Sequence, residues 1–393
     1  MVVRFDPMSA AFNADPYPTY AALRAEDPVH FSPATGAWVI SRYDDVVRVL
    51  RDYERFSSHA IGGGMGQYRF LIGTDPPDHT TLRRLVNRPF HPAAIAALEP
   101  RIREICNGLV EELIAANRTG EADLIQHVGY PLPVIVIAEL MGIPPERRDD
   151  FKRWSDAMLG GLSPDADRGA QAAASMEMFA YFNEAVAERR GQPVDDDADL
   201  ISLLVNGPEA LSNQELLMFC MLLLVAGNET TTNLISNLYL ALFESPDIAE
   251  RLAAERELIP RAIEEALRYD APVQCLFRNT TADVELGGKT IPADSRVVVL
   301  YASANRDEDH YKNSDAFDVE RFNPKAGPSD HVAFGSGIHL CLGAPLARLE
   351  ARVVTDVLLD RTSDLRRNGD GNRIHNLLVR GMRHLPVTFT SVT

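Results

Sequence analysis

The sequence predicts a mainly α-helical protein with small β-sheets. Helical spacing of apolar residues dominates from residue 78 to about 206. A capping box formed by Ser212 and Glu215 then opens an apolar helix that the pattern extends to about residue 243. Runs typical of strands are short, as at 37–40 and 284–286. These features favour helices packed around a buried helical core, with strands confined to small sheets.

The N-terminal part mixes both kinds of element. Residues 18–26 show helical spacing, 37–40 are typical of a strand, and the glycine-rich segment 61–73 predicts a loop. Breaks in the helical region that follows occur at 131–133, 144–145, 163–164 and 195–197. Because these breaks are short, we interpret them as helix connections. We therefore expect residues 1–393 to form a single domain, with a small β-rich part near the N-terminus and a helical core from about residue 75 on.

The helix opened by Ser212 dominates the central region. At about 1.5 Å per residue it would be roughly 45 Å long. A helix that is so long and so apolar must be buried. After it the pattern predicts a helix over 251–269, strands at 284–286 and 296–301, and a last helix from about Gly343.

Composition excludes several classes of function. The chain is 46% hydrophobic, which supports a large core, and its formal net charge of −17 disfavours nucleic acid or an anionic membrane as partner. The longest apolar run, 216–226, is well short of the roughly 20 residues that span a bilayer. The 4 cysteines show no disulfide framework, and the first residues lack the features of a signal peptide. We expect a soluble, cytoplasmic protein.

One cysteine lies in an unusual context. Cys341 stands between a glycine-rich loop and the predicted start of a helix, in the segment 334–343. Backbone N–H groups and the helix dipole would lower the pKa of its thiol there. A buried structural cysteine beside an ordinary turn is the alternative. A zinc site is disfavoured, because no second cysteine or paired histidine stands at ligand spacing.

The whole segment resembles the haem-binding motif of the cytochrome P-450 family, F-x-x-G-x-x-x-C-x-G, with matches at Phe334, Gly337, Cys341 and Gly343. The resemblance implies the family's triangular, mainly helical fold and haem b with Cys341 as axial thiolate ligand to the iron. It further implies that Phe334 shields the thiolate and that N–H groups of the loop, which includes Gly335, hydrogen-bond the sulfur.

Glu265 and Arg268 resemble the family's E-x-x-R helix. Alone they would be an ordinary i,i+3 ion pair. In the family this pair binds an arginine that comes later in the chain, and Arg321 stands at the corresponding position. The resemblance gives these residues a structural role in seating the haem.

The segment 226–232 weakens the long helix, because it combines glycine with consecutive threonines and an acid. A local kink with a paired or solvated glutamate is the simple interpretation. The segment is also similar to the family's A-G-x-D/E-T-T motif for oxygen activation. By that resemblance Ala226 lies against the haem, Thr230 hydrogen-bonds dioxygen during its activation, and Glu229 relays protons.

Haem brings two propionates that need charged partners. His79 and Arg83 are spaced i,i+4 after Asp75-Pro76-Pro77, which resembles the family's D-P-P-x-H-x-x-x-R. Taken alone they would be surface polar residues. The resemblance assigns them to a propionate, and it adds Arg278 and His339 to the set.

The predicted reaction is that of a monooxygenase, which inserts one atom of dioxygen into a C–H or C=C bond of a hydrophobic small molecule. No dinucleotide fingerprint is present, so electrons are expected from a ferredoxin and its reductase. Such a donor is acidic and would meet a basic patch, for which Arg84, Arg88 and Arg348 are candidates unless they are merely solvated. The alternatives are a peroxide-driven peroxygenase and a non-catalytic haem-binding protein. We expect a monomer.

The sequence predicts the substrate pocket only by position. Its expected walls are mostly apolar and comprise 61–71, 158–162, Leu223, Ala226, 273–277 and 377–378. Arg69 is the exception, since a cation there would anchor a polar substrate group. The alternative is that Arg69 points into water.

Overall fold

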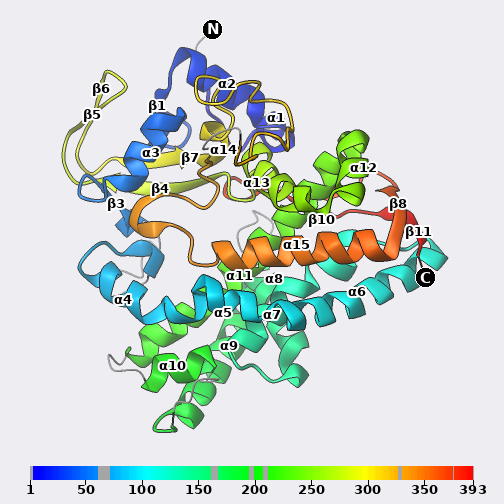
Figure 1. Cartoon of the computed structure of the whole chain (residues 1–393). Helices are drawn as coiled ribbons and strands as arrows, with labels where there is room; N and C mark the ends of the chain where they lie inside the picture. The colour runs from blue at the N-terminus through cyan, green and yellow to red at the C-terminus, as the bar shows by residue number, and fades with distance from the viewer. Residues whose placement is uncertain are drawn as a thin grey trace.

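The computed structural model describes residues 3–60, 71–160, 167–193, 199–206, 211–325, 330–374 and 376–392. The glycine-rich segment 61–70, with Arg69, therefore lies outside the described residues, as do the side chains of 158–160. Helices dominate, as predicted (Figure 1). They are α1 (Ala10–Ala14), α2 (Tyr17–Glu26), α3 (Tyr43–Arg51), α4 (Asp78–Val86), α5 (Pro92–Ala97), α6 (Glu99–Thr119), α7 (Pro131–Leu140), α8 (Arg148–Gly160), α9 (Arg168–Arg189), α10 (Leu200–Asn206), α11 (Asn213–Glu244), α12 (Pro246–Ala254), α13 (Ile259–Tyr269), α14 (Tyr301–Ala304) and α15 (Ala344–Arg361).

The strands form one five-stranded sheet and three strand pairs. The sheet has the order β1-β2-β7-β4-β3 and is antiparallel except between β2 and β7. Its strands are β1 (Val29–Ser32), β2 (Ala37–Ile40), β7 (Arg296–Leu300), β4 (Cys275–Thr280) and β3 (Phe56–Ser57). The pairs are β5 (Val284–Leu286) with β6 (Lys289–Ile291), β9 (Asn372–Arg373) with β10 (Met382–His384), and β8 (Thr362–Arg367) with β11 (Val387–Ser391).

The predicted capping box opens the central helix. The Ser212 hydroxyl accepts from the Glu215 N–H, and the Glu215 side chain accepts from the Ser212 N–H, so two N–H groups at the start of α11 are satisfied. Within the described part of the chain, α11 alone is as long and apolar as a membrane span, and most of it is buried, as expected of a core helix. Figure 1 shows α15 crossing in front of α11, with the five-stranded sheet above them and α4 to α10 below.

One expectation about the C-terminal third was wrong. The helix predicted over 251–269 is two helices, α12 and α13. Pro260 lies in the first turn of α13, where its missing N–H costs nothing, whereas in the interior of a single helix it would break the hydrogen-bond ladder. The last helix, expected from about Gly343, is confirmed as α15, and strands β8 to β11 follow it. Strands β8 to β10 are short and carry basic residues, so apolar alternation did not reveal them, whereas β11 alternates Val387 and Phe389 with threonines and was predictable.

The larger hydrophobic core draws on the whole length of the chain, from Phe5 to Phe389. A second, smaller core lies between α3 and the five-stranded sheet, and it includes Val46, Phe56 and Tyr301. The candidate site described next is built where elements from both cores meet.

Candidate functional site

The loop before α15 holds Cys341 through its backbone. The N–H of Cys341 donates to the Phe334 carbonyl at 2.9 Å, and the N–H of Gly335 donates to the Val332 carbonyl at 2.8 Å. Gly335 and Gly337 have φ of 74° and 71°, which side chains rarely tolerate. A Cβ on Gly337 would lie 2.8 Å from the Leu50 carbonyl oxygen, so α3 approaches the loop too closely for any side chain.

The thiol of Cys341 does not have the lowered pKa that the sequence predicted. Burial raises its pKa, and the opposing effects of the Gly343 and Ala344 N–H groups and of Arg83 and Arg348 do not compensate. Cys341 is nonetheless exposed as a residue, although protein atoms crowd around its sulfur. A thiolate at this position needs a nearby cation, and coordination to a metal would supply one.

His79, Arg83, Arg278 and His339 converge as predicted, although they come from different elements. His79 is 3% exposed and Arg278 2% exposed. The rings of His79 and His339 lie 4.3 Å apart, and the Nε2 atoms of both are buried without a hydrogen-bond partner in the described structure. Burial, with help from His79 and Arg278, lowers the pKa of His339 to about 3. Burial, followed by Arg83, also lowers the pKa of His79. Such a cluster of donors and cations requires an anionic group.

The segment of α11 with Ala226, Glu229 and Thr230 is helical throughout. Ala226 is exposed although it belongs to a core helix, so this face of α11 borders open space. The Thr230 hydroxyl donates to the Ala226 carbonyl at 2.7 Å. Burial raises the pKa of Glu229 to about 7, against the opposing charge of Arg383. Glu229 can therefore exchange a proton near neutral pH.

Glu265, Arg268 and Arg321 also lie together. Arg268 donates to both oxygens of Glu265 at 2.8 and 2.7 Å, and both side chains are fully buried. Arg321 reaches the same carboxylate at 3.3 Å. Arg268 also donates to the carbonyls of Asn305, Ser314 and Ala316. The group ties α13 to the segment that leads into the cysteine loop, which comprises residues 332–343.

Sequence reasoning missed two acids near the site. Glu264 binds Arg348 and His331, as described below. Glu350, on α15, is 1% exposed and hydrogen-bonds Thr231, and burial raises the pKa of its carboxyl to about 8. Glu350 stands between the apolar residues Leu349 and Val353, which are buried, and this position in the sequence could have predicted a buried acid. Nothing near Glu264 in the sequence indicates its partners.

Comparison with known proteins identifies the class to which this site belongs. The family model "Cytochrome P450" matches residues 30–363. The chain is 41% identical to the Vitamin D(3) 25-hydroxylase of Pseudonocardia autotrophica, over 98% of the chain and 96% of the relative. It is 38% identical to the cytochrome P450 monooxygenase PikC of Streptomyces venezuelae, over 96% of the chain and 91% of the relative.

A solved structure agrees. Cytochrome P450 CYP109Q5 from Chondromyces apiculatus superposes with a TM-score of 0.89 at 39% identity, with complete coverage of both chains. The fold and the site together define a haem-thiolate monooxygenase. The chain belongs to the bacterial cytochrome P450 family.

Members of this family use haem with a cysteine thiolate as axial ligand. The residues present fit this cofactor. Cys341 is exposed as a residue, so a cofactor can approach it, and the buried Nε2 atoms of His79 and His339, which lack a hydrogen-bond partner in the described structure, match propionate oxygens. When bound, haem supplies the iron that binds and activates dioxygen.

Proposed function

We propose that Cys341 is the axial ligand of the haem and that His79, Arg83, Arg278 and His339 bind its propionates. The observation that supports this best is the convergence of these residues from α4, β4 and the cysteine loop. Phe334 covers the thiolate, and Gly335, with a φ of 74°, allows the loop to turn close to the macrocycle. A Cβ on Gly343 would meet no described atom within 4 Å, so this glycine leaves room beside the haem. Ala226 leaves room on the opposite side.

In this proposal Glu229 and Thr230 transfer protons. With a pKa of about 7, Glu229 takes up and releases a proton near neutral pH. The Thr230 hydroxyl donates to the Ala226 carbonyl, so its oxygen can accept a hydrogen bond from the open side. A hydroxyl that can rotate between these partners can pass a proton onward.

The proposed electron donor is an acidic ferredoxin. A cleft of about 620 Å³ beside the cysteine loop is lined by residues that include Arg84 and Arg88, next to His79 and Arg83 of the proposed propionate set. Among the described residues, no carboxylate lines this cleft, in a chain with a net charge of −17. An acidic protein would be steered there. Arg348, the third candidate for the patch, is paired with Glu264. We also propose that the protein is a cytoplasmic monomer with one domain.

The proposed substrate is a hydrophobic small molecule that is hydroxylated or epoxidised. The relatives include a Vitamin D(3) 25-hydroxylase and a steroid C26-monooxygenase, and CYP109E1 from Bacillus megaterium was solved with testosterone. A panel of steroids, terpenoids, fatty acids and macrolides, screened for the shift of the ferric haem spectrum, would identify the class. Matched acid and neutral ligands titrated into wild type and Arg69→Ala would show whether Arg69 holds a polar end.

The axial ligand is tested by the spectrum of the ferrous carbonyl form. Wild type should show the strongly red-shifted Soret band of thiolate-ligated haem, and Cys341→His should lose it. Cys106→Ala, which removes a buried thiol from α6, should keep the band. An ordinary Soret position in freshly reduced wild type would refute the assignment.

Turnover separates the remaining alternatives. Product formation with ferredoxin, reductase and reductant, at a rate well above that with hydrogen peroxide alone, supports the monooxygenase over a peroxygenase. A protein that binds haem but forms no product with any ligand that shifts its spectrum would instead be a non-catalytic haem-binding protein.

A further inference from the structure

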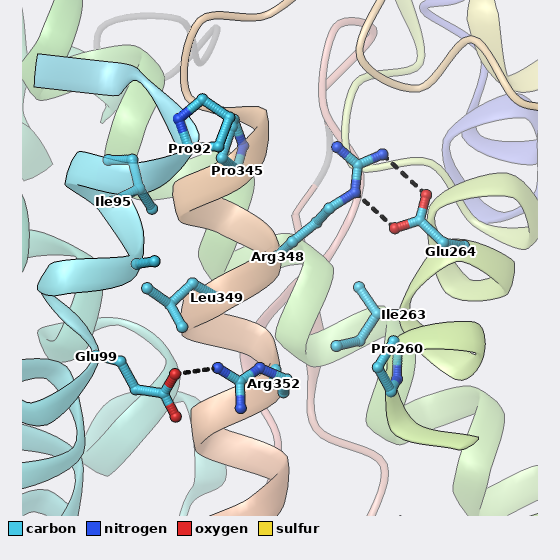
Figure 2. A pocket seen from close by; sticks show the side chains of 11 residues that line it. Pro92, Ile95, Glu99, Pro260, Ile263, Glu264, Pro345, Arg348, Leu349 and Arg352 are labelled. Atoms are coloured by element: carbon cyan, nitrogen blue, oxygen red, sulfur yellow. Dashed lines mark hydrogen bonds and ion pairs between the residues drawn. The ribbon is translucent and has the colours of Figure 1, made fainter. Parts of the chain in front are cut away.

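A groove of about 310 Å³ runs between α5, α13 and α15 on the side of the cysteine loop (Figure 2). Its floor is apolar, with Ile95, Ile263 and Leu349 among the lining residues. Two ion pairs lie along it, both made by arginines of α15. Figure 2 shows Arg348 paired with Glu264 on one side and Arg352 paired with Glu99 on the other.

Glu264 binds three donors with its two oxygens. Arg348 donates from Nε to Oε1 at 2.6 Å and from its terminal nitrogen to Oε2 at 2.8 Å. Nε2 of His331 lies 3.0 Å from Oε2. Because Nδ1 of His331 accepts from the Ala333 N–H, Nε2 is the atom that donates to Glu264. This arrangement fixes both the plane of the guanidinium and the orientation of the imidazole.

Both partners of Glu264 lie against Phe334. The Arg348 guanidinium carbon stands 4.5 Å from the centre of the Phe334 ring, and the His331 ring lies 5.9 Å from it. The Phe334 carbonyl in turn accepts from the Cys341 N–H at 2.9 Å. A continuous set of contacts therefore leads from Glu264 through Arg348 and His331 to Phe334 and Cys341.

We propose that Glu264 is a positioning residue for the thiolate. It holds Arg348 and His331 against Phe334, and Phe334 therefore stays in place as the cover that shields the sulfur of Cys341. Arg348 is partly exposed, with 39% of its side-chain surface accessible, so without the carboxylate it would turn toward water. Phe334 would lose the cation on its face and the loop would loosen. Water could then reach the sulfur and favour its protonated form. The inference rests on the proposed role of Cys341 as ligand.

The second ion pair provides a matched control. Arg352 lies four residues after Arg348 on α15 and pairs with Glu99 of α6. Like Glu264, Glu99 ties α15 to a neighbouring helix at the edge of the same groove. Glu99 pairs with Arg103 and Arg352, which lie on α6 and α15 and not in the cysteine loop. Comparison of the two carboxylates therefore separates the effect of losing a contact between helices from the effect of losing the Phe334 cover over Cys341.

The experiment compares Glu264→Gln with Glu99→Gln as haem-loaded proteins. The readouts are the rate at which the red-shifted carbonyl band converts to the ordinary thiol-type band in mild urea, and the reduction potential of the haem. We expect Glu264→Gln to convert several-fold faster and to shift the potential, while Glu99→Gln stays close to wild type. Equal conversion rates and potentials in the two variants would overturn the proposal.

Arg348→Lys is a second variant that tests the proposal if Glu264→Gln does not fold. Lysine keeps the charge but cannot make the forked pair with Glu264 or lie flat on Phe334. If Glu264→Gln fails to load haem, Arg348→Lys decides: faster conversion supports the proposal and an unchanged rate refutes it. A wild type without the red-shifted band would refute the ligand assignment itself, which is a separate outcome.

Discussion

The cysteine loop and the Ala226 segment of α11 face the same proposed haem from opposite sides, but they are built differently. In the loop, glycines at positive φ, backbone hydrogen bonds and the Glu264 ion pair fix the chain. On α11, the Thr230 hydroxyl bonds, within the described part of the chain, to its own helix, and Glu229 has a pKa near neutrality. In the proposed function, the cysteine loop holds the iron ligand still and the α11 segment lets protons move.

The two sides are joined through α15. This helix begins directly after the cysteine loop, and its residue Glu350 hydrogen-bonds Thr231, the neighbour of Thr230. The two sides therefore differ in their local structure, although they belong to one connected part of the fold. Four predictions test it, in order of decreasing effect.

Gly337→Ala should nearly abolish haem incorporation. The new Cβ would lie 2.8 Å from the Leu50 carbonyl oxygen at a φ of 71°, so the loop could not keep its position. Gly288→Ala is the control, since Gly288 has a φ of 74° but nothing within 4 Å of a Cβ. Haem content per protein, measured after purification, checks this. If both variants load haem equally, the close approach of α3 does not define the loop.

Arg83→Leu should release haem to an acceptor protein faster than wild type. Loss of a charge-assisted hydrogen bond to a propionate costs about 1.5–3 kcal/mol, which is about one to two decades in affinity. Arg118→Leu, an exposed change on α6, should leave the rate unchanged. Release rates are followed by absorbance. An unchanged rate in Arg83→Leu would remove Arg83 from the propionate set.

Thr230→Ala should keep the red-shifted carbonyl band but lose much of its reductant to hydrogen peroxide. The hydroxyl is proposed to deliver protons, and among the described residues it bonds to the Ala226 carbonyl of its own helix. Thr232→Val is the control, because the Thr232 hydroxyl donates away from the open side, to the Gly129 carbonyl at 3.0 Å. Product and peroxide per reductant are measured. Unchanged coupling in Thr230→Ala would move the role to Thr231 or to water.

Glu350→Gln should flatten the pH dependence of folding stability. Burial raises the pKa of Glu350 from 4.5 to about 8, so between these values the native state binds more protons than the unfolded chain. The free energy of unfolding contributed by this group therefore falls as pH rises through that range. Urea unfolding at pH 5 and pH 8 compares wild type, Glu350→Gln and the exposed Glu188→Gln. A wild type whose pH dependence matches that of Glu350→Gln would contradict the raised pKa.

The sequence predicted the residues that belong to short, strongly constrained patterns. Cys341 and its glycines stand in one continuous segment, and His79 and Arg83 lie one helical turn apart, so their proximity follows from spacing alone. The long helix was also predicted, because its capping box and its apolar length are both local features.

Other properties depend on contacts that spacing does not reveal. Glu264 is 84 positions from Arg348, and nothing in either neighbourhood indicates the pair. The pKa of Cys341 was predicted in the wrong direction, because the degree of burial is set by the fold and outweighs the nearby N–H groups. Pro260, in contrast, was a visible signal that the region 251–269 contains two helices.

The close contact between Gly337 and α3 has a consequence for protein engineering. The backbone of Leu50 and Arg51 forms one wall of the cysteine loop, although it is far from the loop in sequence. Transplanting residues 332–343 into another scaffold would move the motif without that wall. A graft that is meant to hold the iron ligand in the same place must therefore include α3, or replace it with a backbone that approaches Gly337 equally closely.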